Sequence, residues 1–192
     1  MSHYAAPCRG YSLAGAGLAL ALLAAMALGR PAAAVRATGA TLSLEPSPAT
    51  ITVTQALTLS LVLDTGGGPA SGVAACLRFD PRYVQIESLE PDPVLPQVLL
   101  TEVDNRAGTL RYEAGRLESP VAGRMTVARL QLRARAATPP AGTWLRFGSS
   151  GLATTDVVYG GGSILAATYD GCVRVEPPGG YRRLWLPLAA RP

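Results

Sequence analysis

Arginine residues recur in segments that alternate apolar and polar side chains, where their guanidinium groups could recognise carboxylates. Arg129 and Arg133 share one parity of a single segment, and Arg78 and Arg111 occur in two others. A guanidinium pairs with a carboxylate through two parallel hydrogen bonds. These four arginines are therefore our candidates for a face that binds an acidic partner. The alternative is a solvated sheet face whose charge prevents edge-to-edge aggregation.

Two aromatic residues, Trp144 and Tyr112, are candidates for a second chemistry, the stacking of a flat ring on a sugar. In the run 143–147, the alternation that exposes Arg146 also exposes Trp144 and buries Leu145. Direct carbohydrate binding is therefore the alternative to recognition of a protein. The other interpretation of Trp144 is a ring folded over the edge of the domain.

The N-terminal residues 1–34 have the pattern of an export signal. Arg9 precedes an uncharged apolar run from Leu13 to Leu28, and the small residues at 32–34 suit an export peptidase. We predict cleavage after Ala34 and a mature protein that is secreted or held at the cell surface, without a transmembrane segment. An uncleaved membrane anchor is the alternative, although the run is shorter than the roughly 20 residues of a spanning helix.

Cleavage there would leave 158 of the 192 residues, which suits one domain. Of the 17 basic residues, Arg9 and Arg30 would be lost, so 15 arginines would face 13 acidic residues, for a net charge of +2. This balance does not favour a nucleic-acid partner. The only histidine, His3, would also be lost, which disfavours Ser-His-Asp, Cys-His and histidine-based metal chemistry.

No motif places two carboxylates across a cleft for glycoside hydrolysis. The loop 104–108 lacks oxygen ligands at the alternate positions of a calcium loop, so we interpret it as a hairpin turn. We therefore predict a protein that is not an enzyme and has no cofactor and no metal. A calcium site formed by Asp156, Asp170 and Glu176 is the alternative that we weigh against this.

The elements that must position these residues are short β-strands. In residues 71–89, Val73 and Leu77 share the inner face, Cys76 and Arg78 share the outer face, and Pro81 ends the strand because it has no N–H for the ladder. Glycine-rich blocks at 66–69 and 160–162 are expected to separate further strands. The predicted strands of this all-β domain are 41–45, 51–53, 57–64, 72–80, 83–89, 99–103, 109–114, 125–136, 143–147, 155–158, 164–168 and 172–176.

Four blocks in order, GVAACLRFDPRYVQIESLEP, VDNRAGTLRYEAG, GRMTVARLQLRARA and YGGGSILAATYDGCVRV, resemble successive parts of a cohesin domain. The resemblance implies a nine-stranded antiparallel β-sandwich of jelly-roll topology and no enzymatic activity. It also implies binding of a calcium-loaded dockerin module through one sheet face, which includes the strand that ends at Asp80-Pro81. The sequence departs from the family there, because Ala74 and Cys76 offer little hydrogen bonding.

We therefore expect an exported, non-catalytic module whose partner is a dockerin-bearing protein or a polysaccharide, acting in extracellular polysaccharide handling. A structural cell-surface protein is a further alternative. The predicted organisation is a signal peptide (1–34), a short linker (35–40), the cohesin-like sandwich (41–177) and a C-terminal tail (178–192) that is either a surface anchor or an edge strand.

Cys76 and Cys172 would be the only thiols of the mature chain. An oxidising compartment favours a disulfide between them. In the cohesin-like arrangement, however, we expect their strands in opposite sheets and both thiols facing outward, beyond the reach of a disulfide. A bond between chains and two separate thiols are the alternatives.

Overall fold

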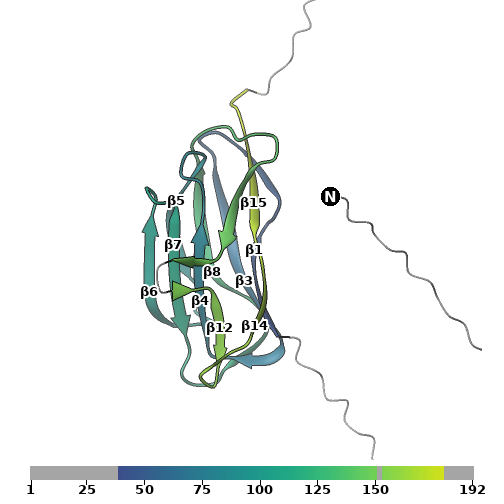
Figure 1. The fold of residues 1–192 in the computed structure, drawn as a ribbon, viewed down its shortest axis with the longest axis vertical. Coiled ribbons are helices and arrows are strands. Elements are labelled where there is room, and N and C mark those ends of the chain that lie inside the picture. The colour runs from purple at the N-terminus through teal and green to yellow at the C-terminus, as the bar shows by residue number, and fades with distance from the viewer. Residues whose placement is uncertain (1–38, 151–152, 180–192) are drawn as a thin grey trace, which may run out of the picture. The chain divides into compact units, whose positions relative to one another are not determined.

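The computed structural model describes residues 39–150 and 153–179, which form a β-sandwich without any helix in these ranges (Figure 1). Every predicted strand is present, and the all-β prediction is confirmed. The strands are β1 (Ala40–Glu45), β2 (Ala49–Thr52), β3 (Ala56–Ala70), β4 (Gly72–Arg78), β5 (Val84–Pro91), β6 (Gln97–Asp104), β7 (Thr109–Gly115), β8 (Val121–Ala134), β9 (Thr143–Phe147), β10 (Ser149–Ser150), β11 (Ala153–Thr154), β12 (Asp156–Tyr159), β13 (Gly162–Ser163), β14 (Leu165–Tyr169) and β15 (Gly171–Glu176).

Two larger sheets form the layers of the sandwich. The first has the strand order β14-β1-β3-β8-β5. In the second, β4 pairs with β7 and β7 pairs with the edge strand β6, while β12 and β9 share the other side of β4. The pairs β1–β14 and β2–β15 are parallel, so the sheets are mixed, whereas the sequence predicted wholly antiparallel ones.

The hydrophobic core lies between the two sheets, as the alternation of residues requires. In β8, Leu130 and Leu132 are fully buried while Arg129 and Arg133 are exposed. The hydroxyl of Tyr112 in β7 crosses the core and donates a hydrogen bond to the carbonyl oxygen of residue 127 in β8, at 3.1 Å. Burial of each large apolar side chain contributes about 1.5–3 kcal/mol, so the leucines of the inner faces dominate the stability of the fold.

The Asp80-Pro81 corner ends β4 and carries the chain from the second sheet to β5 in the first. The backbone N–H of Arg82 donates to the carboxylate of Asp80 at 3.0 Å, and that of Tyr83 donates to the Asp80 carbonyl oxygen at 3.1 Å. These bonds close a tight turn after the strand. The side chain of Arg82 also pairs with the Asp80 carboxylate at 2.6 Å and holds the pKa of that carboxyl group below its usual value.

The β6–β7 connection at residues 104–108 is the predicted hairpin turn, and it packs against this corner. Gly108 has a φ of +69°, and a Cβ there would lie 2.1 Å from the carbonyl oxygen of Phe79, so only glycine fits. The side chain of Asn105 accepts a hydrogen bond from the N–H of Ile86 and donates one to its carbonyl oxygen, both at 2.8 Å. The turn therefore joins the second sheet to β5.

Two glycine-rich blocks behave differently. Gly160 and Gly161 form the predicted turn after β12 in left-handed conformations. The block 66–69 does not separate two strands as expected, because β3 continues through it to Ala70 with an irregular register between Asp64 and Pro69. Glycines there allow a bulge instead of a break.

The short strands β10, β11 and β13 were not predicted from the sequence. β10 and β11 pair as a hairpin that lies against β4. The predicted signal peptide at residues 1–34, the first part of the linker and the tail from residue 180 lie outside the described residues, and they remain predictions.

Candidate functional site

The four arginines proposed as one binding face lie on two different sheets. Arg78 belongs to β4 and Arg111 to β7 of the second sheet, whereas Arg129 and Arg133 belong to β8 of the first. Both pairs face outward, so the body of the sandwich separates them. The prediction of a shared face is therefore wrong, because alternation shows which side of its own strand a residue takes and does not show which sheet the strand joins.

Three of these arginines pair with carboxylates on or next to the strands of their own sheets. Arg111 lies 3.1 Å from Glu102 and 3.7 Å from Glu113. Arg129 lies 3.2 Å from Asp92, and Arg133 pairs with Glu87. Exposed pairs of this kind contribute little to stability, and they reduce the positive charge that each arginine offers to a partner.

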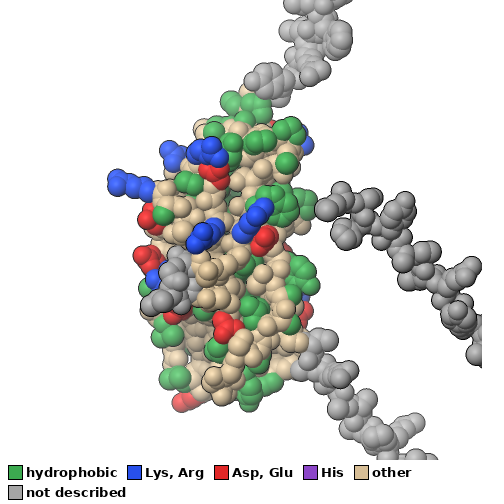
Figure 2. Space-filling model, viewed as in Figure 1, with side chains coloured by type: hydrophobic (Ala, Val, Ile, Leu, Met, Phe, Trp, Pro, Cys, Tyr) green, Lys and Arg blue, Asp and Glu red, His purple; other side chains and the backbone are tan. Residues whose placement is uncertain are grey.

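Arg78 differs from the other three, since it forms no ion pair among the described residues. Its Nε and Nη2 atoms donate to the carbonyl oxygen of Ser149 at 3.2 and 3.1 Å. Figure 2 shows arginine side chains gathered over the upper half of the face that carries β4, where this strand ends. The second sheet therefore keeps cationic groups on its outer face.

The outer face of β4 is partly covered. Alternation directs Cys76 outward, as predicted, but its side chain is only 2% exposed because the β10–β11 hairpin lies against the strand. The expectation that Cys76 is presented on this face is therefore wrong. Ala74 remains half-buried and is the small residue left open at the start of β4.

Cys76 and Cys172 are not joined by a disulfide. Their strands, β4 and β15, belong to the same sheet with β9 between them, and not to opposite sheets as expected. Two strand spacings of about 4.8 Å already exceed the usual Cα separation of a disulfide. The expectation that the two strands belong to opposite sheets is therefore wrong.

An apolar groove that the sequence analysis missed opens at the end of the second sheet where β4 begins. We call it the Leu99 groove. It has a volume of about 810 Å³, and its walls include the exposed side chains of Leu99, Leu117 and Tyr159, with Val158 and Ala74 deeper in. Leu117 is 86% exposed in the β7–β8 connection. A leucine in a connection between strands, where a polar residue is usual, is the feature of the sequence that could have indicated this groove.

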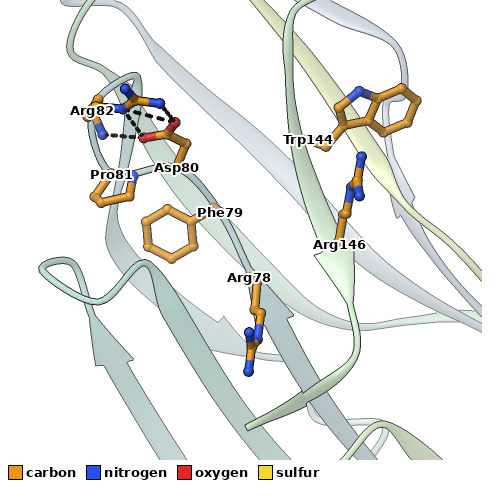
Figure 3. Close-up of a pocket in the computed structure, with 7 residues that line it drawn as sticks. All are labelled: Arg78, Phe79, Asp80, Pro81, Arg82, Trp144 and Arg146. Atoms are coloured by element: carbon orange, nitrogen blue, oxygen red, sulfur yellow. Dashed lines mark hydrogen bonds and ion pairs between the residues drawn. The ribbon is translucent and has the colours of Figure 1, made fainter.

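A second, shallower depression lies at the opposite end of β4. We call it the Trp144 hollow; its volume is about 490 Å³ and its walls include Arg78, Phe79, Trp144 and Arg146 (Figure 3). Trp144 is 44% exposed and Leu145 fully buried, as the alternation predicted. The other aromatic candidate, Tyr112, is fully buried with its hydroxyl in the core, so it cannot stack on a sugar.

The alternative calcium site is not assembled. The carboxylate of Asp156 accepts from the Ser163 hydroxyl at 2.6 Å, that of Asp170 accepts from a backbone N–H at 2.9 Å, and Glu176 lies 3.6 Å from Arg174. Within residues 39–150 and 153–179, no three acidic, cysteine or histidine side chains are grouped as metal ligands. In the same ranges, no helix has the length and apolarity needed to cross a bilayer.

Comparison with known proteins identifies the fold. No protein-family model and no curated protein match the sequence. Similar solved structures include the third cohesin of ScaC from Acetivibrio cellulolyticus, in complex with the ScaB dockerin, which has a TM-score of 0.58 and 11% identity over 71% of this chain and 98% of that chain.

A non-cellulosomal cohesin from the hyperthermophilic archaeon Archaeoglobus fulgidus has a TM-score of 0.56 and 10% identity over 72% of this chain and 91% of that chain. The solution structure of CaCohA2 from Clostridium acetobutylicum has a TM-score of 0.57 and 14% identity over 73% of this chain and 93% of that chain. The likeness covers the sandwich described above, and the resemblance found in the sequence blocks is confirmed at the level of the fold: this chain has the fold of a cohesin domain.

Proposed function

We propose that this chain is an exported, non-catalytic module that binds a protein partner of the dockerin type through the outer face of β12, β4, β7 and β6. The observation that carries the proposal is the Leu99 groove on this face of a cohesin fold. One similar structure holds a dockerin, which supports the class of partner. Such a module would attach its partner to an extracellular assembly that handles polysaccharide.

The groove has the composition of a docking surface. Among the described residues, six large hydrophobic side chains are exposed, and three of them, Leu99, Leu117 and Tyr159, line this one groove. Exposed apolar side chains that cluster in a concave site favour an interaction more than the same residues scattered singly. A partner would therefore place apolar anchors here, at the centre of the contact.

Charged groups beside the groove would set the orientation of the partner. Arg111 in β7 pairs with Glu102 in the neighbouring strand β6 and with Glu113 in its own strand, which gives a group of alternating charge across β6 and β7. Charged rims of this kind influence association rate and specificity more than affinity. Because Ala74 and the covered Cys76 offer little hydrogen bonding, recognition would depend on apolar contacts flanked by this group.

The test is calorimetric titration of the full chain with a panel of calcium-loaded dockerin modules. We expect at least one dockerin to bind, and the double substitution Leu99→Asp and Leu117→Asp to weaken binding by more than about tenfold. Both residues are exposed, so the melting temperature should stay unchanged. Trp144→Ala, at the other end of β4, is the matched control and should bind normally.

Two results would count against the proposal. The first is the absence of binding to every dockerin tested, with the correctly folded protein confirmed by its circular dichroism spectrum. The second is a dockerin that binds the double variant as tightly as the unmodified chain, since the contact would then lie outside the Leu99 groove.

A further inference from the structure

We propose that the Trp144 hollow binds an acidic sugar, a pyranose ring that carries a carboxylate, as in the hexuronate units of a polysaccharide. The hollow and the Leu99 groove lie at opposite ends of β4 and share none of their lining residues. The inference is therefore independent of the partner proposed above, and either one can fail while the other holds.

Trp144 supplies a surface for stacking. Its side chain is 44% exposed, while Leu145, the next residue, is fully buried and fixes β9 against the core. Backbone pairing of Trp144 with Cys172 in β15 holds this position in the middle of a sheet. A flat indole on a rigid strand can contact the apolar face of a pyranose without first being ordered.

Arg146 supplies a cation next to this ring. It lies two positions after Trp144 on the same side of β9, which places the two Cα atoms roughly 6.5–7 Å apart. In Figure 3 the Arg146 side chain extends along the strand toward the indole. Asp170, the residue just before the neighbouring strand β15, accepts from the backbone N–H of Phe147 at 2.9 Å and forms no ion pair with Arg146.

Arg78 adds a second uncompensated charge. It stands directly opposite Arg146 in the antiparallel ladder of β4 and β9, and neither arginine forms an ion pair among the described residues. Like charges at directly paired positions destabilise a sheet. Arg78 turns the other way, toward Ser149, which keeps the guanidinium groups apart and leaves Arg146 available beside the ring (Figure 3).

The carboxylate at the rim does not neutralise this charge. Asp80 is held by Arg82 through three contacts between their side chains, of 2.6 to 3.1 Å. This pairing leaves the hollow with two arginines that have no acidic partner. An anion placed between the indole and Arg146 would relieve the repulsion and gain charge-assisted hydrogen bonds.

The combination of a ring and a cation favours an acidic sugar over other ligands. A neutral sugar would use the indole and leave Arg146 unpaired, whereas an acidic peptide would use the arginine and leave the indole without a flat partner. A hexuronate uses both, because its carboxylate is attached to the ring that stacks. The separation of Trp144 and Arg146 suits a ligand of this size.

The experiment is a titration of the full chain with oligogalacturonate at low ionic strength, followed by calorimetry. We expect measurable binding that weakens by at least about tenfold in Arg146→Gln and in Trp144→Ala. Arg116→Gln is the control, because it removes the same charge from a half-buried arginine at the Leu99 groove, at the other end of the sheet, and it should bind oligogalacturonate as the unmodified chain does.

Two further ligands separate the acidic sugar from its alternatives. Methyl-esterified oligogalacturonate keeps the ring and loses the charge, and we expect it to bind at least about tenfold more weakly. Polyglutamate keeps the charge and lacks the ring, and its binding should not depend on Trp144. The proposal is overturned if oligogalacturonate does not bind, if the esterified ligand binds equally well, or if polyglutamate shows the same dependence on both residues. If the Trp144→Ala variant failed to bind a dockerin, that result would count against the dockerin site at the Leu99 groove and not against the acidic-sugar site.

Discussion

The hydroxyl of Thr155 completes the hydrogen bonding of the Cys76 backbone. Its Oγ1 accepts from the Cys76 N–H at 3.1 Å and lies 3.1 Å from the Cys76 carbonyl oxygen and 3.0 Å from that of Gly148, so its proton can be shared between the two. Gly148 and Thr155 flank the paired strands β10 and β11 at this point. The Cys76 carbonyl oxygen also accepts from the N–H of Gly148 at 3.0 Å, so the Thr155 hydroxyl adds a side-chain contact to this backbone pairing.

Substitution Thr155→Val removes this hydroxyl and keeps the shape of the side chain. Because the polar groups it serves are buried, we expect the free energy of unfolding to fall by about 1–3 kcal/mol. Urea denaturation followed by tryptophan fluorescence measures the change. Thr155→Ser retains the hydroxyl and should lose less stability, so equal losses in the two variants would show that packing of the methyl group is what matters.

The second prediction concerns the hydrogen bond between the sheets from Tyr112 to the carbonyl oxygen of Val127. Tyr112→Phe removes one of the two donors to that oxygen and leaves the N–H of Asp92 at 3.0 Å, and we expect a loss of about 1 kcal/mol in the free energy of unfolding. Tyr159→Phe is the control, since Tyr159 is 44% exposed and its hydroxyl should contribute little. If the two variants had the same free energy of unfolding, the buried hydrogen bond would make no net contribution to stability.

Tyr112 also makes the stability of the fold decrease with pH in the alkaline range. Burial raises the pKa of its phenol above the ordinary value, with a further contribution from the charge of Asp92. The unfolded chain loses the phenol proton near the ordinary tyrosine pKa of about 10, whereas the folded chain keeps it to a higher pH. The stability of the fold is therefore complete below a pH of about 10 and falls as the pH rises further. We expect the unmodified chain to lose stability more steeply than Tyr112→Phe between pH 9.5 and 11 or so. Parallel curves for the two proteins would contradict this.

The third prediction concerns Asn105, whose amide bridges the N–H and the carbonyl oxygen of Ile86. Asn105→Ala removes both bonds at a half-buried position, and we expect a loss of about 2 kcal/mol. Amide hydrogen exchange at Ile86 should accelerate in the variant. Arg106→Ala, at the exposed neighbouring position, is the control, and unchanged exchange at Ile86 in Asn105→Ala would disprove the role of the amide.

The fourth prediction concerns the N-terminal segment, which we expect to be removed on export with Val35 as the new first residue. Expression of the full chain in a bacterial host, followed by mass determination of the exported protein, measures this. Ala32→Phe with Ala34→Phe should block processing, because the peptidase requires small residues there. An exported or membrane-bound protein that retains residues 1–34 would favour the uncleaved anchor.

The strands and their inner faces were predictable from the sequence. Alternation in β4 and β9 identified buried residues such as Val73, Leu77 and Leu145, because side chains of a strand point to opposite sides in turn. Pro81 marked the end of β4, and glycine at position 108 marked the hairpin. These features depend on residues that are near one another in the chain, so the sequence contains the information directly.

The candidate sites depended on contacts between distant segments. Alternation placed Trp144 and Arg146 on the exposed side of one strand, and the structure agrees. It could not show that β8 joins the opposite sheet from β4, which separates Arg129 from Arg78, or that a hairpin of later residues covers Cys76. Nor could it show that Leu99 and Leu117, on either side of β7, meet in one groove.

The sequence by itself therefore determined the fold class, the approximate positions of the longer strands and the side of each that faces the core, since these follow from local alternation and from residues that end a ladder. Only the tertiary structure decided which outward-facing residues share a surface. That outcome depends on the pairing of strands far apart in the chain and on what covers each face. In the structure, the four arginines do not share one face, and the two candidate sites are the Leu99 groove and the Trp144 hollow at opposite ends of β4.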